Sequence, residues 1–219
     1  SKFREFFEKN RAYSLCKYDQ QLNIIDSADF VSHTGENLEV YIRLKQFQAM
    51  DIDDHSNIYL VNPENGFNIK VYSGDFNLKM EFKGNNSHYQ SIPKHIKKTD
   101  IDEYQNIGNT YSVVYALFLI NDNVITSFYK NVPIMEKPKA PYYFDVFSKD
   151  GEKRSSGSLP FPLFGRDDSN NLFLYVKVES NSFFGDDDYY LVAISVAELS
   201  RGVVDREYVL HRINASKKD

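Results

Sequence analysis

The chain has 219 residues, a formal net charge of −5 and one cysteine. The acidic balance gives no electrostatic reason to expect nucleic acid as a partner, and one cysteine excludes an intramolecular disulfide. No run reaches the ~18 apolar residues of a membrane-spanning helix. The 16 Tyr and 17 Phe without Trp favour strands, because flat rings pack well on a pleated surface. We therefore predict an all-β protein.

The N-terminal residues 1–12 are the exception to this strand-rich composition. Phe3, Phe6 and Phe7 recur at helical spacing among charged residues, which predicts a short amphipathic helix. From residue 13 the apolar period becomes that of strands, and we predict one β domain over residues 13–213 with a flexible tail over residues 214–219. Its first strands are predicted at residues 13–18, 22–25, 28–32 and 38–44.

Three stretches then share one order of features: an acidic turn, a short apolar strand, a variable loop, and a second strand that ends in a polar turn. They read MDIDDHSNIYLV…NIKVYSGDFNLKMEF, ALFLINDNVITSFY…YYFDVFSKDGEK and LFGRDDSNNLFLYVKV…YYLVAISVAELSRG. In the first stretch, residues 58–61, 69–72 and 78–82 predict three consecutive antiparallel strands. Repetition of this kind indicates an architecture in which a small sheet recurs.

The same pattern of apolar strands and polar turns continues to the end of the domain. They are predicted at residues 111–118, 124–129, 142–147, 172–178 and 189–196, and a last strand-like run lies within residues 203–213. The polar stretch 84–108 and the proline-containing stretch 130–141 are interpreted as loops.

The repeated stretches resemble a known family of propellers. MDIDDHSNIYLVNPENGFNIKVYSGDFNLKMEF is similar to an NHL-type repeat, in which an acidic turn precedes the inner strand and a strand such as IKVYS is followed by a glycine turn. VVYALFLINDNVITSFYKN…YYFDVFSKDGEKRSSG resembles the C-terminal blades of six-bladed β-propeller proteins common among Bacteroidetes, many of them predicted envelope lipoproteins. The resemblance covers about residues 40–200 and implies radially arranged antiparallel sheets.

A blade needs ~40 residues, so the resemblance implies about four blades of an incomplete ring. Open sheet edges recruit other chains, which predicts a homo-oligomer or blades supplied by a longer chain. The family also implies a location in the periplasm or anchored to the outer membrane, although the lipobox cysteine is not in this sequence.

The function implied by the resemblance is that of a non-enzymatic binding module of a bacterial cell envelope, with a protein or a glycan bound at the blade loops. The alternative is a lactonase-like propeller hydrolase, whose divalent cation would be held by Asp51, Asp53, Asp167 and Asp168, the acidic residues that recur at equivalent places. The five histidines show no HxH or HExxH spacing, and we predict no catalytic residue.

Two groups of residues are candidates for ligand binding. Glu179, Asp186, Asp187 and Asp188 form the densest carboxylate cluster, where Ca²⁺ would relieve the repulsion between charges; the alternative is a solvated loop. Residues 51–57 begin like a calcium loop but lack its Gly and Glu at the sixth and twelfth positions, so an acidic turn explains them better.

The second group consists of aromatic residues in predicted loops and at a strand start. These residues could offer stacking faces to a sugar or a peptide, while core packing is the alternative use of such rings. The group comprises Tyr142, Tyr143, Phe183 and Phe184.

Overall fold

The computed structural model describes residues 13–30, 49–62, 67–84, 86–91, 111–130, 142–178 and 187–216. In these residues the chain is mostly antiparallel β-sheet with two short helices, which confirms the predicted all-β class. The predicted helix in residues 1–12 and the predicted strand at residues 38–44 lie outside the described residues.

Four sheets follow one another along the chain. A hairpin comes first, formed by β1 (Tyr13–Tyr18) and β2 (Ile24–Phe30). The next sheet holds β3 (Met50–Ile52), β4 (Ile58–Asn62), β5 (Asn68–Tyr72) and β6 (Leu78–Lys83). The third holds β7 (Ser112–Ile120), β8 (Asn123–Lys130), β9 (Tyr142–Ser148) and β10 (Lys153–Leu159). The last holds β11 (Leu163–Arg166), β12 (Leu172–Val178) and β13 (Asp188–Ile194), followed by α4 (Val196–Ser200) and α5 (Arg206–Ser216).

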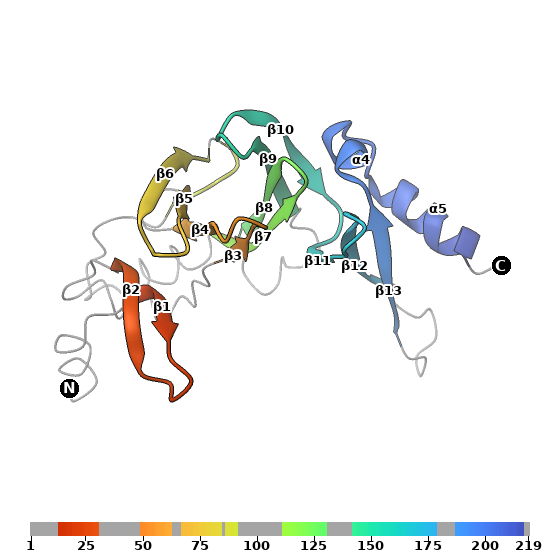
Figure 1. The fold of residues 1–219 in the computed structure, drawn as a ribbon. Coiled ribbons are helices and arrows are strands. Elements are labelled where there is room, and N and C mark those ends of the chain that lie inside the picture. The colour runs from red at the N-terminus through yellow and green to blue at the C-terminus, as the bar shows by residue number, and fades with distance from the viewer. Residues whose placement is uncertain are drawn as a thin grey trace, which may run out of the picture.

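Within each sheet, strands that neighbour in sequence also neighbour in space, and every pair is antiparallel. The first strands of the three larger sheets, β3, β7 and β11, approach one another, and the sheets fan out side by side from them (Figure 1). This confirms the prediction of a recurring antiparallel sheet. The described residues form no closed ring.

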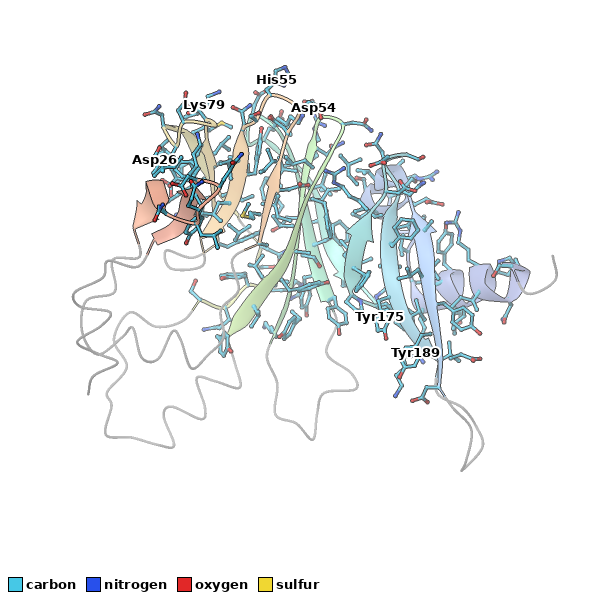
Figure 2. The ribbon with its side chains drawn as sticks, turned by 60° about the horizontal axis from the view of Figure 1, so that its bottom comes forward. Asp26, Asp54, His55, Lys79, Tyr175 and Tyr189 are labelled. Atoms are coloured by element: carbon cyan, nitrogen blue, oxygen red, sulfur yellow. The ribbon has the colours of Figure 1, made fainter. Side chains whose placement is uncertain are left out.

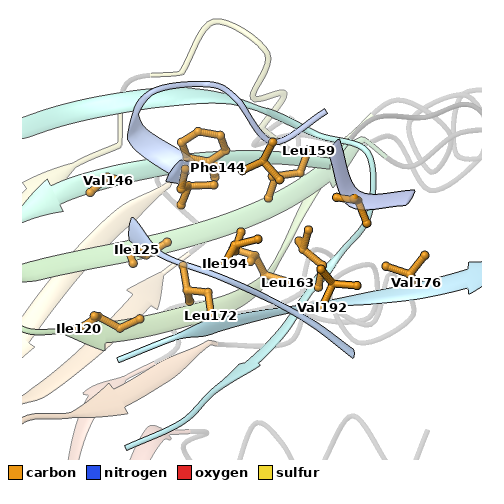
Figure 3. Close-up of a cluster of buried hydrophobic side chains, with 14 of the residues drawn as sticks. Ile120, Ile125, Phe144, Val146, Leu159, Leu163, Leu172, Val176, Val192 and Ile194 are labelled. Atoms are coloured by element: carbon orange, nitrogen blue, oxygen red, sulfur yellow. The ribbon is translucent and has the colours of Figure 1, made fainter. Parts of the chain in front are cut away.

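The sheet β7–β10 is sandwiched between its two neighbours, and its sequence reflects this position. Strand β7 reads SVVYALFLI and is apolar on both faces, because one face packs on β3–β6 and the other on β11–β13. Strand β12 reads LFLYVKV and alternates, with Leu172, Leu174 and Val176 buried. Figure 3 shows the core between β7–β10 and β11–β13, to which α4 and α5 add Leu199, Val209 and Ile213.

The prediction of a strand within residues 203–213 is wrong, because this segment forms helix α5. Its Tyr and Val residues favour strands on propensity. Val209 and Ile213, however, are four residues apart and both buried, which is the spacing of one helix face. Tertiary packing against the last sheet therefore decides the local structure. The helix continues to Ser216, within the segment predicted as a tail.

Candidate functional site

One five-residue turn recurs throughout the described residues and accounts for the acidic turns of the sequence. The N–H of its first residue donates to the carbonyl of the fifth, and the N–H of the fourth donates to the carbonyl of the first, over 2.8 to 3.2 Å. The fourth residue has φ between 59° and 86°, the left-handed conformation that such turns require. The copies lie at residues 19–23, 53–57, 73–77, 148–152 and 167–171.

The aspartates that open these turns are engaged in holding them. Asp53 Oδ1 accepts from the N–H groups of His55 and Asn57 at 2.9 and 2.8 Å, and its Oδ2 accepts from Asn57 Nδ2 at 2.9 Å. Asp167 binds Asn171 in the same way, at 2.8 and 2.9 Å. Burial raises the pKa of Asp53, but these hydrogen bonds outweigh it and the net pKa is lowered. Two of the four carboxylates named for the hydrolase alternative, Asp53 and Asp167, thus serve as turn acceptors.

Asp51 lies where the first strands of three sheets meet. Its Oδ2 accepts from the backbone N–H of Leu119 on β7 at 2.9 Å and from Arg166 Nε on β11 at 3.2 Å. The Asp51 side chain is 20% exposed and that of Arg166 is 32% exposed. The Asp51 carboxylate therefore accepts a hydrogen bond from a backbone N–H of β7 and joins β3 to β11 through Arg166. Arg166 is 115 residues away from Asp51, and no local sequence pattern connects them.

The predicted carboxylate cluster is only partly within the described residues. Glu179 and Asp186 lie outside them. Asp187 forms an ion pair with Lys177 at 2.6 Å, and Asp188 accepts a hydrogen bond from the Tyr190 hydroxyl at 3.1 Å. Among the described residues, no three His, Cys, Asp or Glu side chains are grouped so that they could hold a metal ion.

The predicted aromatic candidates that the structure describes are packed against other rings. Tyr143 is buried, and its ring stacks on His88 at 4.5 Å and on Phe128 at 5.3 Å. Tyr142 is half-buried and meets Tyr115 and Tyr129 edge to face. The alternative reading, core packing, describes both tyrosines. Phe183 and Phe184 lie outside the described residues.

The core between β3–β6 and β7–β10 contains the buried carboxylate of Asp145. Its Oδ1 lies 3.0 Å from both Lys153 Nζ and Asn86 Nδ2. Burial raises its pKa, and the bonds to Lys153 and Asn86 oppose this only in part. The Asp145 Oδ2 and the hydroxyl of Thr126, its neighbour across the strand pair, have no hydrogen-bond partner in the part of the chain that is described. The hydrogen bond between Asn86 and Asp145 therefore attaches the segment that follows β6 to strand β9.

Among the described residues, most exposed aromatic side chains lie on the last sheet. One face of β11, β12 and β13 packs on β7–β10, and the opposite face carries Phe164, Tyr175, Tyr189 and Leu191. Their exposed fractions are 66%, 37%, 55% and 57%. We refer to these four residues as the aromatic face. Figure 2 shows Tyr175 and Tyr189 on neighbouring strands near the end of the fan.

The rings of the aromatic face are in contact with one another. Phe164 and Tyr175 lie 5.7 Å apart with 32° between their planes, and Tyr175 and Tyr189 lie 5.7 Å apart with 21° between their planes. Leu191 is directly opposite Tyr175 in the strand register. The four side chains therefore form a continuous apolar row across three strands, which is unusual for a surface that contacts only water.

The sequence-based prediction missed this face because it concentrated on loops. The available signal is in the strand LFLYVKV, where Tyr175 occupies a position that alternation between a core face and a solvent face reserves for a polar residue. The partner strand repeats the signal, because Tyr189 and Leu191 also alternate with buried or partly buried residues.

Comparison with protein-family models, curated proteins and solved structures finds no match for this chain. In the described residues, no helix is both long and apolar enough to cross a lipid bilayer.

Proposed function

We propose that this chain is a non-enzymatic binding module whose aromatic face packs against another protein surface. The observation that carries the proposal is the exposed row of Phe164, Tyr175, Tyr189 and Leu191 on a sheet whose other face is in the core. The proposed setting, a bacterial cell envelope, comes from the resemblance of the repeated stretches to envelope propellers.

The order of the sheets supports a protein as the partner. Each contact between successive larger sheets joins two apolar faces, first β3–β6 with β7–β10 and then β7–β10 with β11–β13. The aromatic face is the next face in this series. A protein surface that packs on it would repeat a contact that the chain already makes twice.

The orientation of the rings favours a protein over a glycan. A sugar stacks on an open ring face, whereas Tyr175 stacks its ring on that of Tyr189 at 5.7 Å and also contacts Phe164. These rings and the Leu191 side chain suit apolar side chains of a protein, and aromatic residues are enriched in such interfaces.

Site-specific photo-crosslinking tests the proposal. p-Benzoylphenylalanine at position 164 should give discrete protein adducts in expressing cells, and the change Tyr175→Lys should reduce them. The same group at position 22 is the matched control, because Leu22 is 78% exposed in the turn between β1 and β2. Equal adducts at positions 22 and 164, no adduct at 164, or binding of oligosaccharides that depends on Tyr175 would contradict the proposal.

A further inference from the structure

The last sheet differs from the two before it in the number of its strands. The sheets β3–β6 and β7–β10 have four strands each, whereas β11–β13 has three, and β13 lies at its edge. In the two larger sheets, β5 and β9 occupy the third position and each pairs with a fourth strand. After β13 the chain enters the capping box of Ser195 and Glu198 and forms α4.

Two hydrogen bonds show which backbone groups of β13 point away from β12. The carbonyl of Ala193 accepts a hydrogen bond from Arg212 on α5, so the backbone N–H and C=O of Ala193 point to the outer edge of the sheet. On β12 the N–H of Tyr175 donates to Pro162 at 3.0 Å, toward β11, so Tyr175 and its opposite residue Leu191 do not bond to each other. Backbone direction alternates along a strand. Tyr189 and Leu191 therefore also direct their N–H and C=O groups to the outer edge.

This outer edge is open at Tyr189 and Leu191. Within the described residues, neither Tyr189 nor Leu191 forms a backbone hydrogen bond outside its own sheet. Their side chains are 55% and 57% exposed. Helix α5 lies beside the other end of β13, next to α4 (Figure 1). An apolar edge with unpaired backbone groups is a template for a further strand.

We infer that a second copy of this chain pairs with the outer edge of β13 through the same edge of its own. With the two strands antiparallel, Tyr189 of one copy lies opposite Leu191 of the other, and the reverse. Each such pair exchanges two N–H···O=C bonds. The contact is self-complementary, as a two-fold interface requires, and it uses the two open residues while Arg212 keeps its bond to Ala193.

Side chains and charges fit this register. A two-fold axis perpendicular to the sheet places both aromatic faces on the same side, so that they form one continuous apolar surface. The register that pairs 189 with 191 also pairs 187 with 193. Asp187 of each copy, which is bound to its own Lys177, then lies near Arg212 of the other copy, which is bound at Ala193. Opposite charges therefore meet at both ends of the contact.

The inference goes beyond the proposed function, because a second copy at the β13 edge leaves the aromatic face open to another protein. Light scattering coupled to size-exclusion chromatography, from low to high micromolar concentration, should show the native chain as a dimer. Leu191→Lys introduces a charge at the edge, and Leu191→Pro removes an N–H that is not part of the ladder with β12. Both should weaken the dimer about tenfold or more, with the circular dichroism spectrum unchanged.

Leu78→Lys is the matched control, because Leu78 is 53% exposed on β6, the edge strand of another sheet. It should leave the dimer intact. A monomer at all concentrations, a dimer that persists in Leu191→Lys, or a dimer lost equally in Leu78→Lys would overturn the inference. A monomer that still gives adducts at position 164 overturns the edge pairing and supports the proposed function, whereas a monomer without adducts contradicts both.

Discussion

The strongest stability prediction concerns Asp51, whose carboxylate joins β3, β7 and β11. Asp51→Ala leaves the Leu119 N–H without its acceptor, and an unsatisfied buried donor costs about 1–3 kcal/mol. Loss of the half-exposed ion pair with Arg166 adds about 0–1 kcal/mol. We expect the free energy of unfolding to fall by roughly 1–4 kcal/mol, most of it from the unsatisfied Leu119 N–H.

Urea denaturation followed by circular dichroism measures this change, since the chain has no Trp. Arg166→Ala removes only the ion pair and should cost about 0–1 kcal/mol. Asp51→Asn keeps an oxygen acceptor and should cost less than Asp51→Ala. Asp54→Ala, an exposed neighbour, should stay within about 0.5 kcal/mol of the native chain. If Arg166→Ala costs as much as Asp51→Ala, the ion pair and not the amide is the main contribution, and the reasoning is refuted.

Three further predictions concern other parts of the fold. A Cβ at position 84 would lie 1.8 Å from Phe67 Cδ1, so Gly84→Ala should lower the free energy of unfolding by about 1–3 kcal/mol in urea, and an unchanged value would contradict the packing. Leu174 is fully buried and Tyr175 is not, so Leu174→Ala should cost about 2–5 kcal/mol and Tyr175→Ser much less; equal costs would place the aromatic face in the core. Partial burial raises the pKa of Glu198, but hydrogen bonds from Tyr208 and Ser195 and the charge of Arg212 lower it to about 2 from an ordinary 4.5. Its stabilisation is therefore complete above pH 4.5 and lost as the pH falls toward 2, and Glu198→Gln should flatten this acid dependence of helical circular dichroism; an unchanged acid transition would contradict the role of Glu198.

The sheets could be predicted because two local signals coincide. Apolar alternation marks each strand, and the spacing of Asp53 to Asn57 and of Asp167 to Asn171 marks the turns. Helix α5 was not predicted because Tyr208 and Val209 favour strands, while the spacing of Val209 and Ile213 that indicates a helix is satisfied only by packing on the last sheet.

The candidate site depends on long-range arrangement, which a single sequence does not contain. Tyr143 has the composition of a binding residue, but His88 and Phe128 cover its ring. Alternation in LFLYVKV separates Tyr175 from its core neighbours, but only the packing of the sheets shows that its face is open and that Leu191 lies opposite it. Sequence composition identified aromatic residues as candidates, and only the order of the sheets separates those in the core from those at the surface.

Hydroxyl-radical footprinting of the tyrosines tests the open aromatic face most directly. In dilute purified protein, Tyr175 and Tyr189 should be labelled strongly and the buried Tyr143 weakly. In cells that express the chain, Tyr175 and Tyr189 should be protected while Tyr18, which is 52% exposed on β1, stays labelled. Protection of Tyr175 and Tyr189 in the dilute protein, or equal labelling in both conditions, would contradict a face that binds another protein.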